Sequence, residues 1–290
     1  MLKCNPKFIL LFFTAIITSC APPQSFYKME GTLNLRNKIN KIVEESEIDL
    51  NMSIQITSLK NDKIIYDYNS QKLLMPASTN KLYTCAAAFH FLKKHHQFKT
   101  DVLSNKKNLV LKGGGDPDLS IKELDSLALE VSKKYKNIDT LFIDDTFLDS
   151  LNYGEGWMWD EGPWWYAAPI SALSVNDNCI DFYIKPGPAG KAASIDYYPK
   201  TSFIKFKNAS ITVQDSVLKK LKIDRDWVLN KNTFYAYGEL IDTSDVDTLY
   251  RNIYNPSTFT GIVFKESLER FGTKVKAISR KKTYNKSYKK

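Results

Sequence analysis

A paired-strand pattern that leads through a loop into an alanine-rich helix most constrains how this chain can fold. Segments Met52–Leu59 and Lys63–Tyr68 have strand character and flank a turn at Asn61-Asp62, which predicts a β-hairpin. Pro76 then punctuates a loop, and an apolar helix is predicted over Leu82–Leu92. This stretch therefore combines a hairpin with a helix, and what lies at the start of that helix bears on function.

The loop ends in a Ser-x-x-Lys tetrad, Ser78-Thr79-Asn80-Lys81. On a helix, residues three apart share a face, so the lysine amine can reach the serine hydroxyl. A serine needs a nearby base to become a nucleophile, and a lysine serves as that base when burial or neighbouring cations disfavour its charged form. The backbone N–H of Ser78 is a candidate for half of an oxyanion hole. The alternative is a helix-capping serine beside a surface lysine, because such tetrads also occur by chance.

Strand and helix patterns continue along the chain, except in the Gly-, Pro-, Trp- and Tyr-rich stretch 150–200, where few elements are assigned. Helices are predicted over Leu33–Glu47, over about 15 residues from Ser120 and over Thr258–Arg270, and strands over Phe98–Leu103, Asn108–Leu111, Thr140–Ile143, Ile180–Ile184 and Ile211–Val213. The polar tail from Lys274 is expected to be disordered.

The N-terminal segment resembles an export signal. Lys3 and Lys7 precede the apolar run Phe8–Ile17, which is too short to span a bilayer and fits the apolar region of a signal peptide. Ile17-Thr18-Ser19-Cys20 follows and resembles a bacterial lipobox, which implies a lipid on Cys20 as the new N-terminus. The alternative is a plain signal peptide with a chance cysteine. We expect a lipoprotein that is exported to the periplasmic side of the cell envelope and held at the membrane through Cys20.

The charge distribution argues against a nucleic-acid binder. The 290 residues carry a net charge of +9, but two lysines lie in residues 1–19 and eight basic residues in 274–290, with no acid in either segment. Residues 20–273 therefore carry a net charge of −1, which offers no basic groove for phosphates.

The cysteines that remain unmodified after export are Cys85 and Cys179, which would form a disulfide or be small buried hydrophobic residues. No Cys/His spacing resembles a metal site, so no metal and no cofactor are expected.

Landmarks around the tetrad give the chain a family resemblance. The hairpin leads into Pro76–Leu82, followed by Gly113–Leu119, Ile143–Phe147, Gly156–Asp160, Tyr166–Ala172 and Asn178–Ile180. In this order they resemble the D-alanyl-D-alanine carboxypeptidases of peptidase family S13, the low-molecular-mass class C penicillin-binding proteins. The resemblance runs from about residue 30 to about residue 278.

The resemblance implies an α+β fold: a β-lactamase- or transpeptidase-like antiparallel sheet with flanking helices, interrupted by a large inserted β-rich domain and incomplete at the C-terminus. We expect a signal peptide at 1–19, a tether at 20–28 and the first part of the transpeptidase-like domain at 29–101. The insertion is expected at 102–248, a return to the first domain at 249–273 and a basic tail without an identified family counterpart at 274–290.

The resemblance also implies acyl transfer on peptidoglycan stem peptides. Ser78 would be the nucleophile and Lys81 the general base, terminal D-alanine would be released, and β-lactams would acylate Ser78 as substrate mimics. The alternative from another class is a non-catalytic envelope lipoprotein that binds peptidoglycan or a partner chain. A class A β-lactamase is disfavoured, because no Ser-Asp-Asn follows near Asp139.

The resemblance stops at two motifs. The family also uses a Ser-x-Asn and a Lys-Thr-Gly, and no Lys-Thr-Gly occurs in this sequence. Ser174-Val175-Asn176 is interpreted as a decoy, because it falls within the stretch that resembles the inserted domain. We therefore expect the family chemistry to be impaired in this chain alone. A truncated reading frame, a split protein with a separate chain for the other half, and a decayed homologue remain open.

Three further features have mainly structural interpretations. The aromatic residues at 157, 159 and 164–166 are expected to pack together, although such rings also stack on sugars. The triple glycine at 113–115 is interpreted as a turn. The carboxylates Asp116, Asp118, Asp144 and Asp145 are interpreted as caps and turns.

Overall fold

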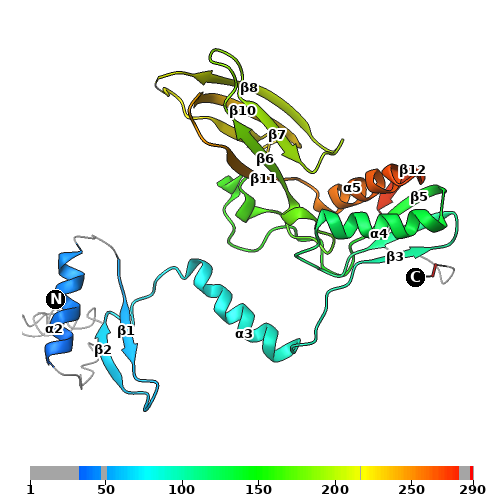
Figure 1. Ribbon diagram of the computed structural model, residues 1–290. Coiled ribbons are helices and arrows are strands. Elements are labelled where there is room, and N and C mark those ends of the chain that lie inside the picture. Colours follow the sequence, from blue (N-terminus) through cyan, green and yellow to red (C-terminus); the bar gives the residue numbers. More distant parts are fainter. Residues whose placement is uncertain (1–32, 47–50, 216, 281–287, 290) are drawn as a thin grey trace, which may run out of the picture. The chain divides into compact units, whose positions relative to one another are not determined.

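The chain divides into two compact units, Met1–Lys94 and His95–Lys290. The computed structural model describes residues 33–46, 51–215, 217–280 and 288–289, shown in Figure 1. The expected signal peptide, the tether and the lipid-bearing Cys20 lie outside the described residues.

The first unit begins with helix α2 (Leu33–Glu45), followed by strands β1 (Ile54–Thr57) and β2 (Ile64–Tyr68). The strands pair antiparallel, and Asp62 in the turn has a left-handed backbone, so the predicted helix and hairpin are confirmed with shorter strands. Tyr66 is fully buried, and its hydroxyl donates a 2.8 Å hydrogen bond to Oδ1 of Asn40 on α2. This tyrosine therefore ties the hairpin to the helix.

The first unit continues through the short 3₁₀ helix η1 (Ala77–Asn80) into helix α3 (Lys81–Phe91). No residue of either helix is buried. Among residues 34–46 and 51–94, Tyr66 is the one buried side chain. The described part of this unit therefore encloses almost no hydrophobic core of its own, although α3 confirms the predicted helix.

The second unit contains a four-stranded sheet in the order β12-β5-β4-β3. Its strands are β3 (Asp101–Ser104), β4 (Asn108–Lys112), β5 (Asn137–Asp144) and β12 (Lys274–Arg280). β4 and β12 both run parallel to β5, while β3 runs antiparallel to β4. The predicted pair at 98–111 and the strand at 140–143 are confirmed.

Two helices pack side by side with this sheet, α4 (Ile121–Lys134) and α5 (Pro256–Arg270), and α5 contacts β5 and β12 (Figure 1). Helix α4 begins where the sequence predicts, and α5 begins at Pro256, two residues before the predicted start at Thr258. The Ser120 side chain caps α4 and forms a reciprocal capping box with Glu123. The Asn255 side chain accepts from the Thr258 N–H at the start of α5, with proline in the first turn.

Strand β12 corrects the expectation that the tail from Lys274 is disordered. The backbone of residues 274–280 pairs with β5, and Val275 is buried in the core. Lys276 pairs with Asp139, and the guanidinium of Arg280 pairs with the buried carboxylate of Asp145. Two of the basic side chains that suggested a solvated tail therefore meet acidic partners that lie far away in the sequence.

A β-rich region separates α4 and β5 from α5 in the sequence. One three-stranded sheet has the order β11-β6-β7, with β6 (Cys179–Lys185), β7 (Ser194–Tyr198) and β11 (Asp247–Asn252). The other has the order β8-β10-β9, with β8 (Lys205–Val213), β9 (Lys222–Arg225) and β10 (Thr233–Ile241), and β8 runs parallel to β10. Phe182 of the first sheet lies 5.2 Å and 5.3 Å, between ring centroids, from Phe206 and Phe234 of the second. These rings join the two sheets through one core.

The mixed α+β class is confirmed. Residues 249–273, where the sequence predicted a return to the first domain, belong to the same compact unit as residues 102–248, because α5 packs with α4, β5 and β12. None of the helices in the described ranges is long and apolar enough to cross a membrane.

Candidate functional site

The Ser-x-x-Lys tetrad brings its two chemical groups into contact. Nζ of Lys81 lies 3.0 Å from Oγ of Ser78, within hydrogen-bond distance. Ser78 lies in η1 and Lys81 is the first residue of α3, so the turn between them sets this spacing. The geometry matches what a nucleophilic serine and its base require.

The backbone before the serine is unusual. Ala77 has a φ of +44°, in the left-handed region that residues with a side chain rarely adopt. Such conformations cost about 1–3 kcal/mol each and concentrate at functional sites. Thr79 donates both its N–H and its hydroxyl to the carbonyl of Pro76, which holds the turn.

Ser78 does not act as a helix cap. Neither η1 nor α3 has a side-chain capping bond, and the N-cap of α3 is Asn80. Within the described part of the chain, the backbone N–H of Ser78 also has no hydrogen-bond partner. The capping alternative is therefore not what the structure shows, and the Ser78 hydroxyl accepts from the Lys81 amine instead.

The surroundings of the tetrad are sparse. Ser78 and Lys81 are both exposed, and Ser78 is the one hydrogen-bond partner of the Lys81 amine among the described residues. A lysine becomes an effective base through burial or neighbouring cations. The described residues of the first unit supply the serine hydroxyl and the lysine amine but neither of these influences.

The triplet interpreted as a decoy lies in the second unit and makes structural contacts. The Ser174 hydroxyl donates to the Ser171 carbonyl and accepts from the Asn178 amide. The Asn176 amide donates to the Cys179 carbonyl and to Asp181. The roles assigned to Ser78 and Lys81, and the decoy interpretation of Ser174 and Asn176, remain predictions.

The triple glycine is more than a turn. A Cβ on Gly113 would lie 2.1 Å from the Ala172 carbonyl oxygen, and one on Gly114 would lie 2.3 Å from that of Lys99. Gly115 has a φ of +77°. The three glycines therefore allow two chain segments to approach the end of β4 closely.

The carboxylates fit their interpretation in part. Asp116 and Asp144 accept N–H groups two residues ahead, as turn residues do, whereas Asp145 is buried beside Arg280. No three His, Cys, Asp or Glu side chains in the described ranges lie together as metal ligands would. Both Cys85, which is exposed, and Cys179, which is buried, are free thiols.

The aromatic cluster is packed only in part. The rings of Trp164 and Tyr166 stack with their centroids 6.3 Å apart, and the Arg251 guanidinium lies 4.5 Å from the Trp164 ring. Trp164, Trp165 and Tyr166 nevertheless remain exposed.

Comparison with protein families decides the identity. A family model described as "D-Ala-D-Ala carboxypeptidase 3 (S13) family" matches residues 35–288. The chain belongs to this S13 family. The match also corrects the expectation that residues 274–290 have no family counterpart, because it extends almost to the last residue.

Curated relatives of this S13 chain are carboxypeptidases. It is 29% identical over 259 residues to a D-alanyl-D-alanine carboxypeptidase of Actinomadura sp. (strain R39), covering 83% of this chain and 48% of the relative. It is 32% identical over 160 residues to the D-alanyl-D-alanine carboxypeptidase DacB of Haemophilus influenzae, covering 52% of this chain and 33% of the relative. The chain thus spans about half the length of the curated relatives it matches, or less.

Solved structures share the fold. Penicillin binding protein 4 (dacB) from Haemophilus influenzae superposes with a TM-score of 0.66 at 23% identity, covering 81% of this chain and 54% of that one. A structure of the same protein complexed with a β-lactam gives a TM-score of 0.59 at 21% identity, with 79% and 51% covered.

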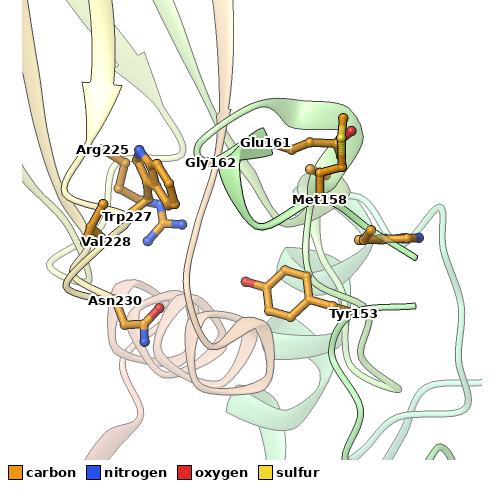
Figure 2. Close-up of a pocket in the computed structure, with 10 residues that line it drawn as sticks. Tyr153, Met158, Glu161, Gly162, Arg225, Trp227, Val228 and Asn230 are labelled. Atoms are coloured by element: carbon orange, nitrogen blue, oxygen red, sulfur yellow. The ribbon is translucent and has the colours of Figure 1, made fainter. Parts of the chain in front are cut away.

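The sequence did not predict a cavity that the structure of the S13 chain contains. A cavity of about 420 Å³ lies in the second unit, between residues 153–167 and the turn that joins β9 to β10 (Figure 2). The buried Arg225 lines it. An isolated arginine at the end of a short strand gives no signal in the sequence, because its surroundings come from segments about 70 residues away.

Proposed function

We propose that this S13 chain carries the nucleophilic half of a serine-type D-Ala-D-Ala carboxypeptidase that acts on peptidoglycan stem peptides. The observation that supports this most directly is the 3.0 Å contact between Nζ of Lys81 and Oγ of Ser78 in a chain of this family. The uncapped Ser78 hydroxyl and the strained Ala77 before it agree with such a role.

In this mechanism Oγ of Ser78 attacks the carbonyl carbon between the two D-alanines, and its proton passes to the neutral amine of Lys81. The oxyanion accepts a hydrogen bond from the backbone N–H of Ser78. Lys81 then returns the proton to the departing amine, terminal D-alanine leaves, and the peptide remains as an ester on Ser78. Water hydrolyses this ester and restores the serine. β-Lactams would form the same kind of ester and inhibit the protein.

We infer that turnover is slow in the 290 residues alone. No Lys-Thr-Gly is present, and the Ser-x-Asn at 174–176 lies in the second unit, bonded to its own neighbours. Loss of a single oxyanion donor lowers the rate by about 10²–10³. A separate chain that supplies the missing groups would restore turnover. A lipid on Cys20 would hold the protein on the periplasmic side of the cell envelope, where stem peptides occur.

The test is release of D-alanine from Nα,Nε-diacetyl-L-lysyl-D-alanyl-D-alanine. We expect slow release by the purified chain and none by Ser78→Ala, whereas Lys81→Met lowers the rate by about 10²–10⁴. Ser46→Ala is the matched control, because Ser46 is an exposed serine in the same unit whose hydroxyl bonds only the Val43 carbonyl. Release that persists in Ser78→Ala would overturn the proposal. A folded chain that releases no D-alanine would favour the non-catalytic alternative, a lipoprotein that binds peptidoglycan or a partner chain.

A further inference from the structure

Two chain segments form the opposite sides of the cavity in the second unit (Figure 2). Arg225 at the end of β9 and Trp227, Val228 and Asn230 in the following turn form one side. Residues of the segment 153–167 form the other, and the Tyr153 hydroxyl points toward the side that holds Arg225 and Asn230. Its volume of about 420 Å³ falls in the range of small-molecule sites, roughly 300–1,000 Å³.

The charge of Arg225 is buried, and among the described residues Asp226 acts on it from nearby without forming an ion pair. The residue is 5% exposed, and its guanidinium donates to two neutral groups, the Lys231 carbonyl and Oδ1 of Asn252. Its Nε–H has no hydrogen-bond partner, and no carboxylate of a described residue forms an ion pair with it. The nearby Asp226 carboxylate pairs instead with Lys231, at 3.6 Å.

Such a charge is costly to bury, because desolvation disfavours a cation that has no counter-ion. The burial lowers the pKa of Arg225 below its ordinary value, although a guanidinium still keeps its proton at neutral pH. An anion in the cavity would offset this cost. The guanidinium has five N–H donors, of which described residues use one on each Nη. The Nε–H is buried, so a carboxylate, which matches the planar geometry of the group, would pair through the remaining Nη donors.

The remaining walls select the rest of the ligand. The indole rings of Trp157 and Trp227 and the side chains of Met158 and Val228 present apolar surface to the cavity. Gly162, with a φ of +51°, places its backbone against the Trp227 ring, since a Cβ there would lie 3.0 Å from the indole. Trp227 is therefore held as a fixed wall. Burial raises the pKa of Tyr153, so its hydroxyl stays protonated at neutral pH and can donate to an anion.

The carboxylate of Glu161 limits the negative charge that a ligand of this cavity can carry. Glu161 also lines the cavity, so a dianion such as phosphate meets about twice the repulsion that a single carboxylate meets there. We propose that this cavity binds a small organic monocarboxylate with an aromatic or aliphatic body, whose carboxylate pairs with Arg225 and whose body packs between the tryptophans. This site is independent of Ser78.

The test compares two probes of nearly equal shape, 3-phenylpropionate and 3-phenylpropanamide, by isothermal titration calorimetry on the purified chain. We expect the carboxylate to bind at least about ten-fold more tightly than the amide, because the charge-assisted bond to arginine is lost in the amide. Saturation-transfer NMR should show magnetisation transfer from the protein to the phenyl ring.

Variants locate the binding. A change of Arg225 itself would remove two hydrogen bonds that support the fold. The test variant is therefore Val228→Asp, which adds a negative charge at the exposed edge of the cavity. We expect about five-fold weaker binding of the carboxylate and little change for the amide. Val246→Asp is the matched control, because Val246 is 69% exposed, Val228 is 67% exposed, and only Val228 lines the cavity.

Ser78→Ala should bind the carboxylate as the wild type does, so failure of the peptidase proposal leaves this one intact. Equal affinity for the two probes, no saturable binding at millimolar concentration, or equal effects of the two valine variants would overturn it.

Discussion

The ion pair between Arg280 and Asp145 should contribute strongly to the stability of the protein by holding strand β12 in place. Two bonds join them: Arg280 Nε donates to Oδ1 at 3.0 Å, and Nη2 lies 2.6 Å from Oδ2. The Asp145 carboxylate is 7% exposed, and its remaining described contact is the hydroxyl of Ser257 on α5. The change Arg280→Met keeps much of the side-chain stem and leaves this carboxylate without its cation.

The size of the expected loss in stability depends on the fact that Asp145 is buried whereas Arg280 is half exposed. Breaking a fully buried pair costs about 3–5 kcal/mol, but Arg280 is 52% exposed, so water replaces part of what is lost. A hydrogen bond to a charged group contributes about 1.5–3 kcal/mol, and we expect a loss of about 2 kcal/mol from the free energy of unfolding. For a unit of this size, that lowers Tm by about 4–8 °C.

Urea unfolding, monitored by circular dichroism, measures this loss of free energy of unfolding. Lys276→Met is the matched control, since Lys276 lies on the same strand and pairs with Asp139 on β5, with side chains 74% and 50% exposed. An exposed pair contributes about 0–1 kcal/mol, so the control should unfold almost as the wild type does. Equal, small effects of the two changes would show that Asp145 is not buried beside Arg280 and would refute the reasoning.

Three further changes test the second unit and the thiols. Gly113→Ala should cost about 3 kcal/mol in urea unfolding or prevent folding, because its Cβ would lie 2.1 Å from the Ala172 carbonyl; near wild-type stability would contradict that packing. Burial raises the pKa of Cys179 to about 12, so iodoacetamide at pH 8 should label the exposed Cys85 and reach Cys179 only after unfolding, as peptide mapping would show. Burial raises the pKa of Asp181 above 3.8, so its contribution favours folding at low pH and is lost as pH rises through the folded pKa. Asp181→Asn should therefore stabilise the chain at pH 7 and remove this fall in stability with rising pH; an unchanged pH profile would contradict the assignment.

The parts of the fold predicted from sequence depend on local signals. Helix α4 begins at Ser120 because the serine and Glu123 satisfy each other's backbone donors, and both lie within one turn. The Ser78 and Lys81 contact likewise depends on a three-residue spacing, so the sequence was sufficient to find it.

The parts that sequence missed depend on distant partners. Strand β12 is rich in basic residues and resembles a solvated tail until β5 is placed beside it. The environment of Arg225 requires Asn252 and the segment 153–167, which no local pattern brings together. Tertiary contacts of this kind override the local preference of a polar stretch.

The central claim is that Ser78 is a nucleophile, and acylation by a labelled penicillin tests it most directly. The chain from Cys20 onward, without lipid, is incubated with the reagent and analysed by intact mass and peptide mapping. We predict one adduct, on the peptide that contains Ser78, absent from Ser78→Ala and present in Ser46→Ala. A well-folded chain that forms no adduct, or an adduct that survives in Ser78→Ala, would contradict the assignment.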